Sequence, residues 1–88
     1  MSQSISSLPP DTIVAMIWDF RGPSSRQIAE HHRIHLNEFM TMEALDFRVL
    51  EVRQGATQMH SVFLSVNVGL VADLRARLKP HRGQIVKS

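Results

Sequence analysis

The chain has 88 residues and a mass of 10.0 kDa, which is the size of one small domain. Its composition, 43% hydrophobic and 20% charged, excludes wholesale disorder. The absence of cysteine excludes disulfides and zinc sites with thiolate ligands. No apolar run approaches the roughly 18 residues of a membrane-spanning helix, and the N-terminus shows no signal-peptide pattern. We therefore expect a cytoplasmic protein without a membrane segment.

The charge is small overall but uneven along the chain. The formal net charge is +2, which is too low to predict non-specific nucleic-acid binding. The basic residues of the last fifth of the chain are Arg75, Arg77, Lys79, Arg82 and Lys87, against the single acid Asp73. This basic C-terminal segment is typical of a helix C-terminus followed by a solvated tail. A contact with an anion or a nucleic acid is the alternative.

The first half of the chain predicts a strand, a helix and a second strand. Residues 1–10 are rich in serine and end in two prolines, so we expect a flexible tail before a single domain over 11–88. Thr12–Phe20 is apolar on both faces, which predicts a strand in the middle of a sheet. Ser24 and Gln27 form a capping-box pattern that predicts a helix from Ser24 to about Ala44. Phe47–Arg53 alternates charged and apolar residues like an edge strand.

The second half predicts two strands around a shorter helix. Met59–Val68 alternates as a strand after the turn at Gly55. Asn67 can cap a helix over about Gly69–Lys79, which Pro80 ends. Gly83–Lys87 is a plausible edge strand.

The resulting order, β-α-β-β-α-β, predicts an α+β, ferredoxin-like fold with a four-stranded antiparallel sheet. Right-handed crossovers then place both helices on one face, with the first and third strands in the centre. The opposite face would carry one side of the first strand together with Met59 and Phe63. Because such an apolar face is costly to expose, we expect two chains to bury these faces against each other as a homodimer.

Three histidines in the first predicted helix are the leading candidates for chemistry. His31 and His35 are i,i+4 neighbours, and His32 and His35 are i,i+3 neighbours, so either pair could bind a metal. No third ligand is evident nearby, so we expect no metal site and no cofactor. The structural interpretation makes His32 a hydrogen-bonded core residue, whereas the functional one makes a single histidine a general acid or base.

The end of the first strand supplies further candidates. Asp19 can orient a histidine, so we select His35, His32 and Asp19 as the catalytic candidates. The candidate ligand-binding residues are Trp18, Arg21 and Phe63.

The strand and helix within residues 12–40, with the motif His32-x-x-His35-Leu36, resemble the dimeric α+β barrel superfamily. This superfamily includes YciI-like, EthD-like and muconolactone isomerase-like proteins, in which two ferredoxin-like sheets pack face to face around a small-molecule cavity. The resemblance implies that His32 or His35 lies near a catalytic site. The turn at Gly55-Ala56-Thr57 lacks the aspartate that YciI-like proteins would pair with that histidine.

The sequence thus predicts a homodimer that binds a small organic molecule, or performs acid/base chemistry on it, in an inter-sheet cavity. Whether the protein is an enzyme stays open. The alternative is a module that binds a nucleic acid or a regulatory partner through the basic C-terminal segment. We do not expect nucleic-acid binding, because the aromatic residues Trp18 and Phe63 lie among apolar neighbours that favour burial.

Overall fold

A computed structural model describes residues 8–87, so the expected tail over residues 1–10 lies mostly outside the described residues. The elements are the strands β1 (Ile13–Arg21), β2 (Val49–Gln54), β3 (Met59–Asn67) and β4 (Arg82–Lys87), the helices α1 (Ser25–Met42) and α2 (Val71–Leu78), and a short 3-10 turn over Val68–Leu70. Every predicted element is present, with ends shifted by at most two residues. Within residues 8–87 no helix is long and apolar enough to cross a membrane.

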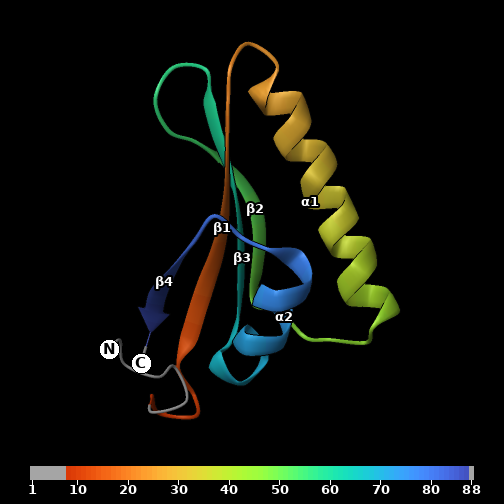
Figure 1. Ribbon diagram of the computed structural model, residues 1–88, viewed down its shortest axis with the longest axis vertical. Coiled ribbons are helices and arrows are strands. Elements are labelled where there is room, and N and C mark those ends of the chain that lie inside the picture. Colours follow the sequence, from red (N-terminus) through yellow and green to blue (C-terminus); the bar gives the residue numbers. More distant parts are fainter. Residues whose placement is uncertain (1–7, 88) are drawn as a thin grey trace.

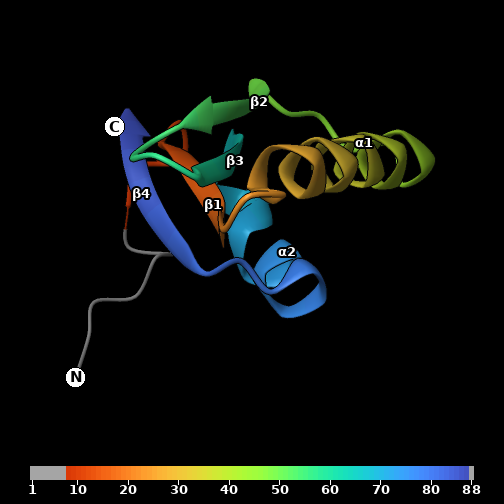
Figure 2. The same cartoon turned by 90° about the horizontal axis from the view of Figure 1, so that it is seen from above.

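The four strands form one antiparallel sheet in the order β2-β3-β1-β4. β1 and β3 are central, as the apolar character of both faces of β1 predicted. Both helices lie on the same side of the sheet, and β4 lies at the edge beyond β1 (Figures 1 and 2). The structure therefore confirms the α+β class and the four-stranded antiparallel sheet.

The core lies between the helices and one face of the sheet, which we call the helix face. Residues on paired strands that lie directly opposite each other share a face. The core residues of β1 and β3 are Val14, Met16, Trp18, Val62, Leu64 and Val66. α1 contributes Ala29, Leu36 and Met40, and α2 contributes Val71 and Leu74.

The other side of the sheet, which we call the open face, differs from the expectation of an exposed apolar patch. Ile13, Ala15 and Ile17 lie there, yet they are only 7%, 2% and 0% exposed in a single chain. Phe63 and Met59 share this face and are half-buried. Small side chains lie beside the middle pair of this face, Ile17 and Phe63, because Ala15 lies opposite Ser65 and Asp19 opposite Ser61 across β1 and β3.

The ends of the helices follow the predicted signals in part. The side chain of Asn67 accepts a hydrogen bond from the backbone N–H of Gly69, so the predicted cap before α2 is confirmed. The side chain of Ser24 makes no capping hydrogen bond at α1, so the predicted capping box is not formed. α2 ends at Lys79, which adopts the left-handed conformation just before Pro80.

Two methionines of α1 test the position of the core. Met40 is fully buried, whereas Met42 is 82% exposed. We expect Met40→Ala to lower the free energy of unfolding by about 2–5 kcal/mol, because it removes buried apolar contacts and leaves a cavity. Met42→Ala should change it by less than about 0.5 kcal/mol. Urea denaturation measures both, and equal effects of the two substitutions would contradict this placement of α1.

Candidate functional site

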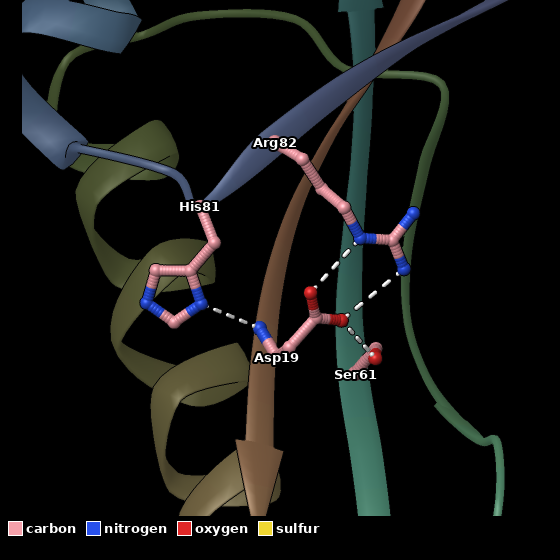
Figure 3. A network of polar contacts seen from close by, with 4 residues as sticks. All are labelled: Asp19, Ser61, His81 and Arg82. Atoms are coloured by element: carbon pink, nitrogen blue, oxygen red, sulfur yellow. Dashed lines mark hydrogen bonds and ion pairs between the residues drawn. The ribbon is translucent and has the colours of Figure 1, made fainter.

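A polar cluster on the open face joins three strands at one end of the sheet (Figure 3). Asp19 of β1 lies directly opposite Ser61 of β3. The hydroxyl of Ser61 donates to Asp19 Oδ1 at a distance of 2.5 Å. Arg82, the first residue of β4, donates from Nε to Asp19 Oδ2 at 2.9 Å and from Nη2 to Oδ1 at 3.2 Å. Arg82 itself lies opposite Ile17 on β1, so its side chain extends along the open face toward Asp19, two residues further along β1.

The electrostatics of this cluster keep Asp19 charged. The paired guanidinium of Arg82 lowers the pKa of Asp19 below its ordinary value, the hydroxyl of Ser61 adds to the effect, and partial burial opposes it. The same ion pair raises the pKa of Arg82. A carboxylate stabilised in this way is a poor proton donor near neutral pH, so Asp19 acts here as an anchor for β4 rather than as a general acid.

His81 fixes the start of β4 against β1. Its ring Nδ1 accepts a hydrogen bond of 2.8 Å from the backbone N–H of Asp19, and the backbone N–H of His81 donates to the carbonyl of Ile17. In the neutral ring the proton must therefore lie on Nε2, because Nδ1 is the acceptor. The Nε2–H remains as a donor on an exposed side chain.

His32 lies on the helix face, between α1 and β1. Its ring centroid is 4.9 Å from that of Trp18 and 5.5 Å from that of Phe20. Burial lowers the pKa of His32, and repulsion from His35 and His81 adds to this effect. Within residues 8–87 its Nε2 is buried and has no hydrogen-bond partner. His32 is thus a neutral, packed residue, but the hydrogen bond of the core interpretation is not formed.

His35 points away from this core. It is exposed on α1, where its Nε2 lies 2.9 Å from Nε2 of His31. Asp19 lies on the opposite side of the sheet from His32, as the register of β1 requires. The three predicted catalytic residues His35, His32 and Asp19 therefore do not form one site.

The three predicted ligand-binding residues are also separated. Trp18 is 3% exposed on the helix face, and its indole N–H donates to the carbonyl of Leu78 at 3.1 Å. Phe63 lies on the open face, with the guanidinium of Arg53 stacked 4.3 Å above its ring. Arg21 is an exposed residue at the end of β1. Since alternate residues of a strand face opposite sides, Trp18 and Phe63 could share a site only if one strand slipped by a residue.

The structure also pairs Ser25 with His60, which the sequence did not indicate. Ser25 Oγ lies 2.8 Å from His60 Nδ1, across 35 positions of the chain. A serine bonded to a histidine suggests a nucleophile, but Ser25 is only 1% exposed. The pair therefore ties the start of α1 to β3 rather than presenting a reactive hydroxyl.

The sequence analysis also missed a hollow on the helix face, between β4 and α2. Its volume is about 390 Å³. Its walls are formed by Val14, Met16, Val71, Arg75, Pro80, His81, Arg82, Gly83, Gln84 and Ile85. β1 and α2 supply an apolar floor, and the edge carries the cation Arg75 and the imidazole of His81. None of these described lining residues carries a carboxylate.

A second, smaller hollow lies on the open face between β2 and β4. It measures about 200 Å³ and is lined by Ala15, Val49, Arg53, Phe63, Ser65, Gln84, Ile85 and Val86. Small side chains form its centre, and Val49, Ile85 and Val86 are 37%, 51% and 57% exposed at its sides. The two hollows adjoin opposite sides of β4, which supplies Gln84 and Ile85 to both.

The lowered pKa values of His32 and Asp19 predict separate pH windows for stability. Because the pKa of folded His32 is below about 6.5, its contribution is complete above pH 6.5 and is lost as pH falls through the folded pKa. The contribution of Asp19 is complete above about pH 4 and is lost only in more acidic solution.

We therefore expect the melting temperature to begin falling below about pH 6.5, and His32→Leu to remove this part of the decline. His35→Ala is the comparison variant: it removes only the smaller, repulsive contribution of His35 to the lowered pKa of His32, so it should change the pH profile much less than His32→Leu does. Calorimetry between pH 4.5 and 8 measures this. A profile of His32→Leu that parallels the parent protein would contradict the assignment.

Comparisons with known proteins add no assignment. No protein-family model matches the chain, and neither a curated protein nor a solved structure matches it. The functional argument therefore starts from the geometry of the two hollows and of the polar cluster beside them.

Proposed function

We propose that this chain is a homodimeric protein that binds a small organic anion in the hollow between β4 and α2. The observation that carries the proposal is the combination of an apolar floor with a basic edge in a cavity of about 390 Å³. Ligand pockets of small molecules typically measure about 300–1,000 Å³ and combine an apolar lining with a few polar groups.

The lining residues indicate the class of ligand. Val14, Met16 and Val71 are at most 3% exposed and form the floor that would contact the apolar part of a ligand. Arg75 is exposed on α2 and can pair with a carboxylate, while Nε2–H of His81 can donate a hydrogen bond. An aromatic or aliphatic carboxylic acid has both parts, so it is the class that we propose.

The inter-sheet cavity suggested by the sequence is a second place for a ligand. In one chain the open-face hollow is only about 200 Å³, below the usual range of ligand pockets. A partner sheet laid across it would enclose it and enlarge it. Because Ala15, Ser61 and Ser65 are small, two facing sheets would leave space beside these residues rather than pack solidly there.

The open face itself supports association with a second copy of the chain. Exposed Val49 and Val86 flank it, and Phe63 is half-buried at its middle. Its described charged side chains are the acids Asp19 and Glu51 and the bases Arg21, Arg53 and Arg82. A face with so small a net charge repels its own copy only weakly, which favours an isologous contact.

The proposal includes the finer description of the fold. All neighbouring strands are antiparallel, β1 and β3 are central, and both helices cover one face. These features support a ferredoxin-like protomer, and dimerisation through the open face would make a barrel of the kind found in the dimeric α+β barrel superfamily.

The alternative function, binding of a nucleic acid or regulatory partner by the basic C-terminal segment, has less support. Arg77 is paired with Glu43 at 3.2 Å and with Asp73 at 3.3 Å, and Arg82 is paired with Asp19. These ion pairs reduce the charge available to phosphates. Trp18 and Phe63 face opposite sides of the sheet, so they cannot form one stacking surface for bases.

A titration with benzoate tests the ligand site. Gly83 lies opposite Met16, and a Cβ at Gly83 would lie 3.7 Å from the Ala15 carbonyl oxygen, an ordinary contact. Gly83→Val should therefore fill the hollow without loss of stability. We expect millimolar benzoate to shift amide resonances of β4 and α2 in the parent protein, and at least tenfold weaker binding to Gly83→Val.

Gly55→Ala is the matched control, because it changes a glycine in a turn away from the hollow, and it should bind like the parent. Benzyl alcohol, which lacks the carboxylate, should bind more weakly than benzoate. Shifts that persist in Gly83→Val would contradict the site between β4 and α2. Shifts confined to Phe63 and Ser65 would instead place the ligand on the open face.

Sedimentation tests the dimer. At micromolar concentration the parent protein should sediment with twice the mass of the 10.0 kDa chain. Phe63→Asp should give a folded monomer, because it replaces an apolar ring in the contact by a charged group while the core on the helix face is intact. The control Ile34→Asp alters an exposed residue of α1 and should stay dimeric. A compact 10.0 kDa species for the parent protein would rule out this association.

A further inference from the structure

The exposed surface of α1 carries two histidine side chains whose nitrogens converge. His31 and His35 lie one turn apart, their ring centroids are 4.4 Å apart, and the rings are inclined by 70°. Their Nε2 atoms are separated by only 2.9 Å. One Nε2 carries a proton and the other accepts it, so the two ring nitrogens face each other across this hydrogen bond.

We propose that His31 and His35 form a binding site for Cu²⁺ or Ni²⁺. Two nitrogens held about 2.05 Å from a metal at a right angle are about 2.9 Å apart, whereas a tetrahedral angle separates them by about 3.4 Å. The observed separation therefore matches adjacent positions of a square-planar or octahedral ion better than tetrahedral zinc. Copper also binds nitrogen ligands more tightly than the other divalent ions of its row.

A neighbouring carboxylate orients one of the two ligands. Glu38 Oε1 lies 3.6 Å from Nδ1 of His35, on the opposite side of the ring from the shared position. A proton on Nδ1 of His35 would be attracted by this carboxylate and would leave the lone pair of Nε2 for a metal. His31 becomes the second ligand when its proton moves from Nε2 to Nδ1.

The site is open on its outer side. Within residues 8–87 no group of three histidine, aspartate or glutamate residues is arranged to hold a metal ion, so water or an external ligand would fill the other positions. The sequence analysis predicted no metal site because it found no third ligand near these histidines, whereas the present proposal needs only two. Because both histidines are exposed and lie outside the core, the fold does not depend on the ion.

Calorimetric titration with Cu²⁺ at pH 7.5, in the presence of glycine as a competing chelator, tests the proposal. We expect one ion per chain, with affinity at least tenfold lower in His31→Ala/His35→Ala. Asn37→Ala is the matched control, because it changes an exposed residue of the same helix and leaves every histidine in place, and it should bind within twofold of the parent. The electron paramagnetic resonance spectrum of bound Cu²⁺ should lose its imidazole nitrogen couplings in the double variant.

Circular dichroism of the double variant should match that of the parent, which separates loss of ligands from loss of fold. A fall in affinity of less than tenfold in the double variant would overturn the proposal. Zinc binding as tight as copper binding would overturn the geometric assignment of the ion. The site is separate from the hollow between β4 and α2, so benzoate binding should be unchanged in the double variant.

Discussion

The structure depends on the burial of β1 on both of its faces. All six residues from Ile13 to Trp18 are buried, although they alternate between the helix face and the open face. β3 and β4 are hydrogen-bonded to its two edges, so β1 lies in the interior of the sheet. Its position then decides where every candidate residue lies, because each step along β1 changes the face.

The two faces of β1 have different roles in consequence. The helix face receives α1 and α2 and forms the core, with Trp18 anchored by a hydrogen bond to the end of α2. The open face keeps small side chains beside Ile17 and Phe63 and a charged cluster at one end. Arg82 links this cluster to β4 and helps to cover Ile17, which is why the open face is less apolar than its sequence suggests.

β4 is the element on which the two proposed cavities meet. It is paired along one edge with β1 and held at its start by His81 and Arg82. On one side it forms the wall of the larger hollow with α2, and on the other side it borders the open-face hollow. An organic anion between β4 and α2 and a second chain on the open face would therefore both contact the same strand.

The local patterns of this sequence were enough to determine the elements and the central place of β1. Apolar residues on both sides of Ile13–Trp18 have no stable location except inside a sheet, and Asn67 and Pro80 mark the ends of α2 by backbone chemistry. The i,i+4 relation of His31 and His35 also followed from helical geometry alone.

Only the tertiary structure decided how these elements combine into sites. The register between β1 and β3 separates Asp19 from His32 and Trp18 from Phe63, and register is set by packing between segments about 45 residues apart in sequence. The Ser25–His60 pair joins residues 35 positions apart, and the contact of Arg82 with Asp19 joins residues 63 positions apart. The hollow between β4 and α2 exists because Gly83 has no side chain where β4 passes the helix, a relation between distant segments that no local pattern contains.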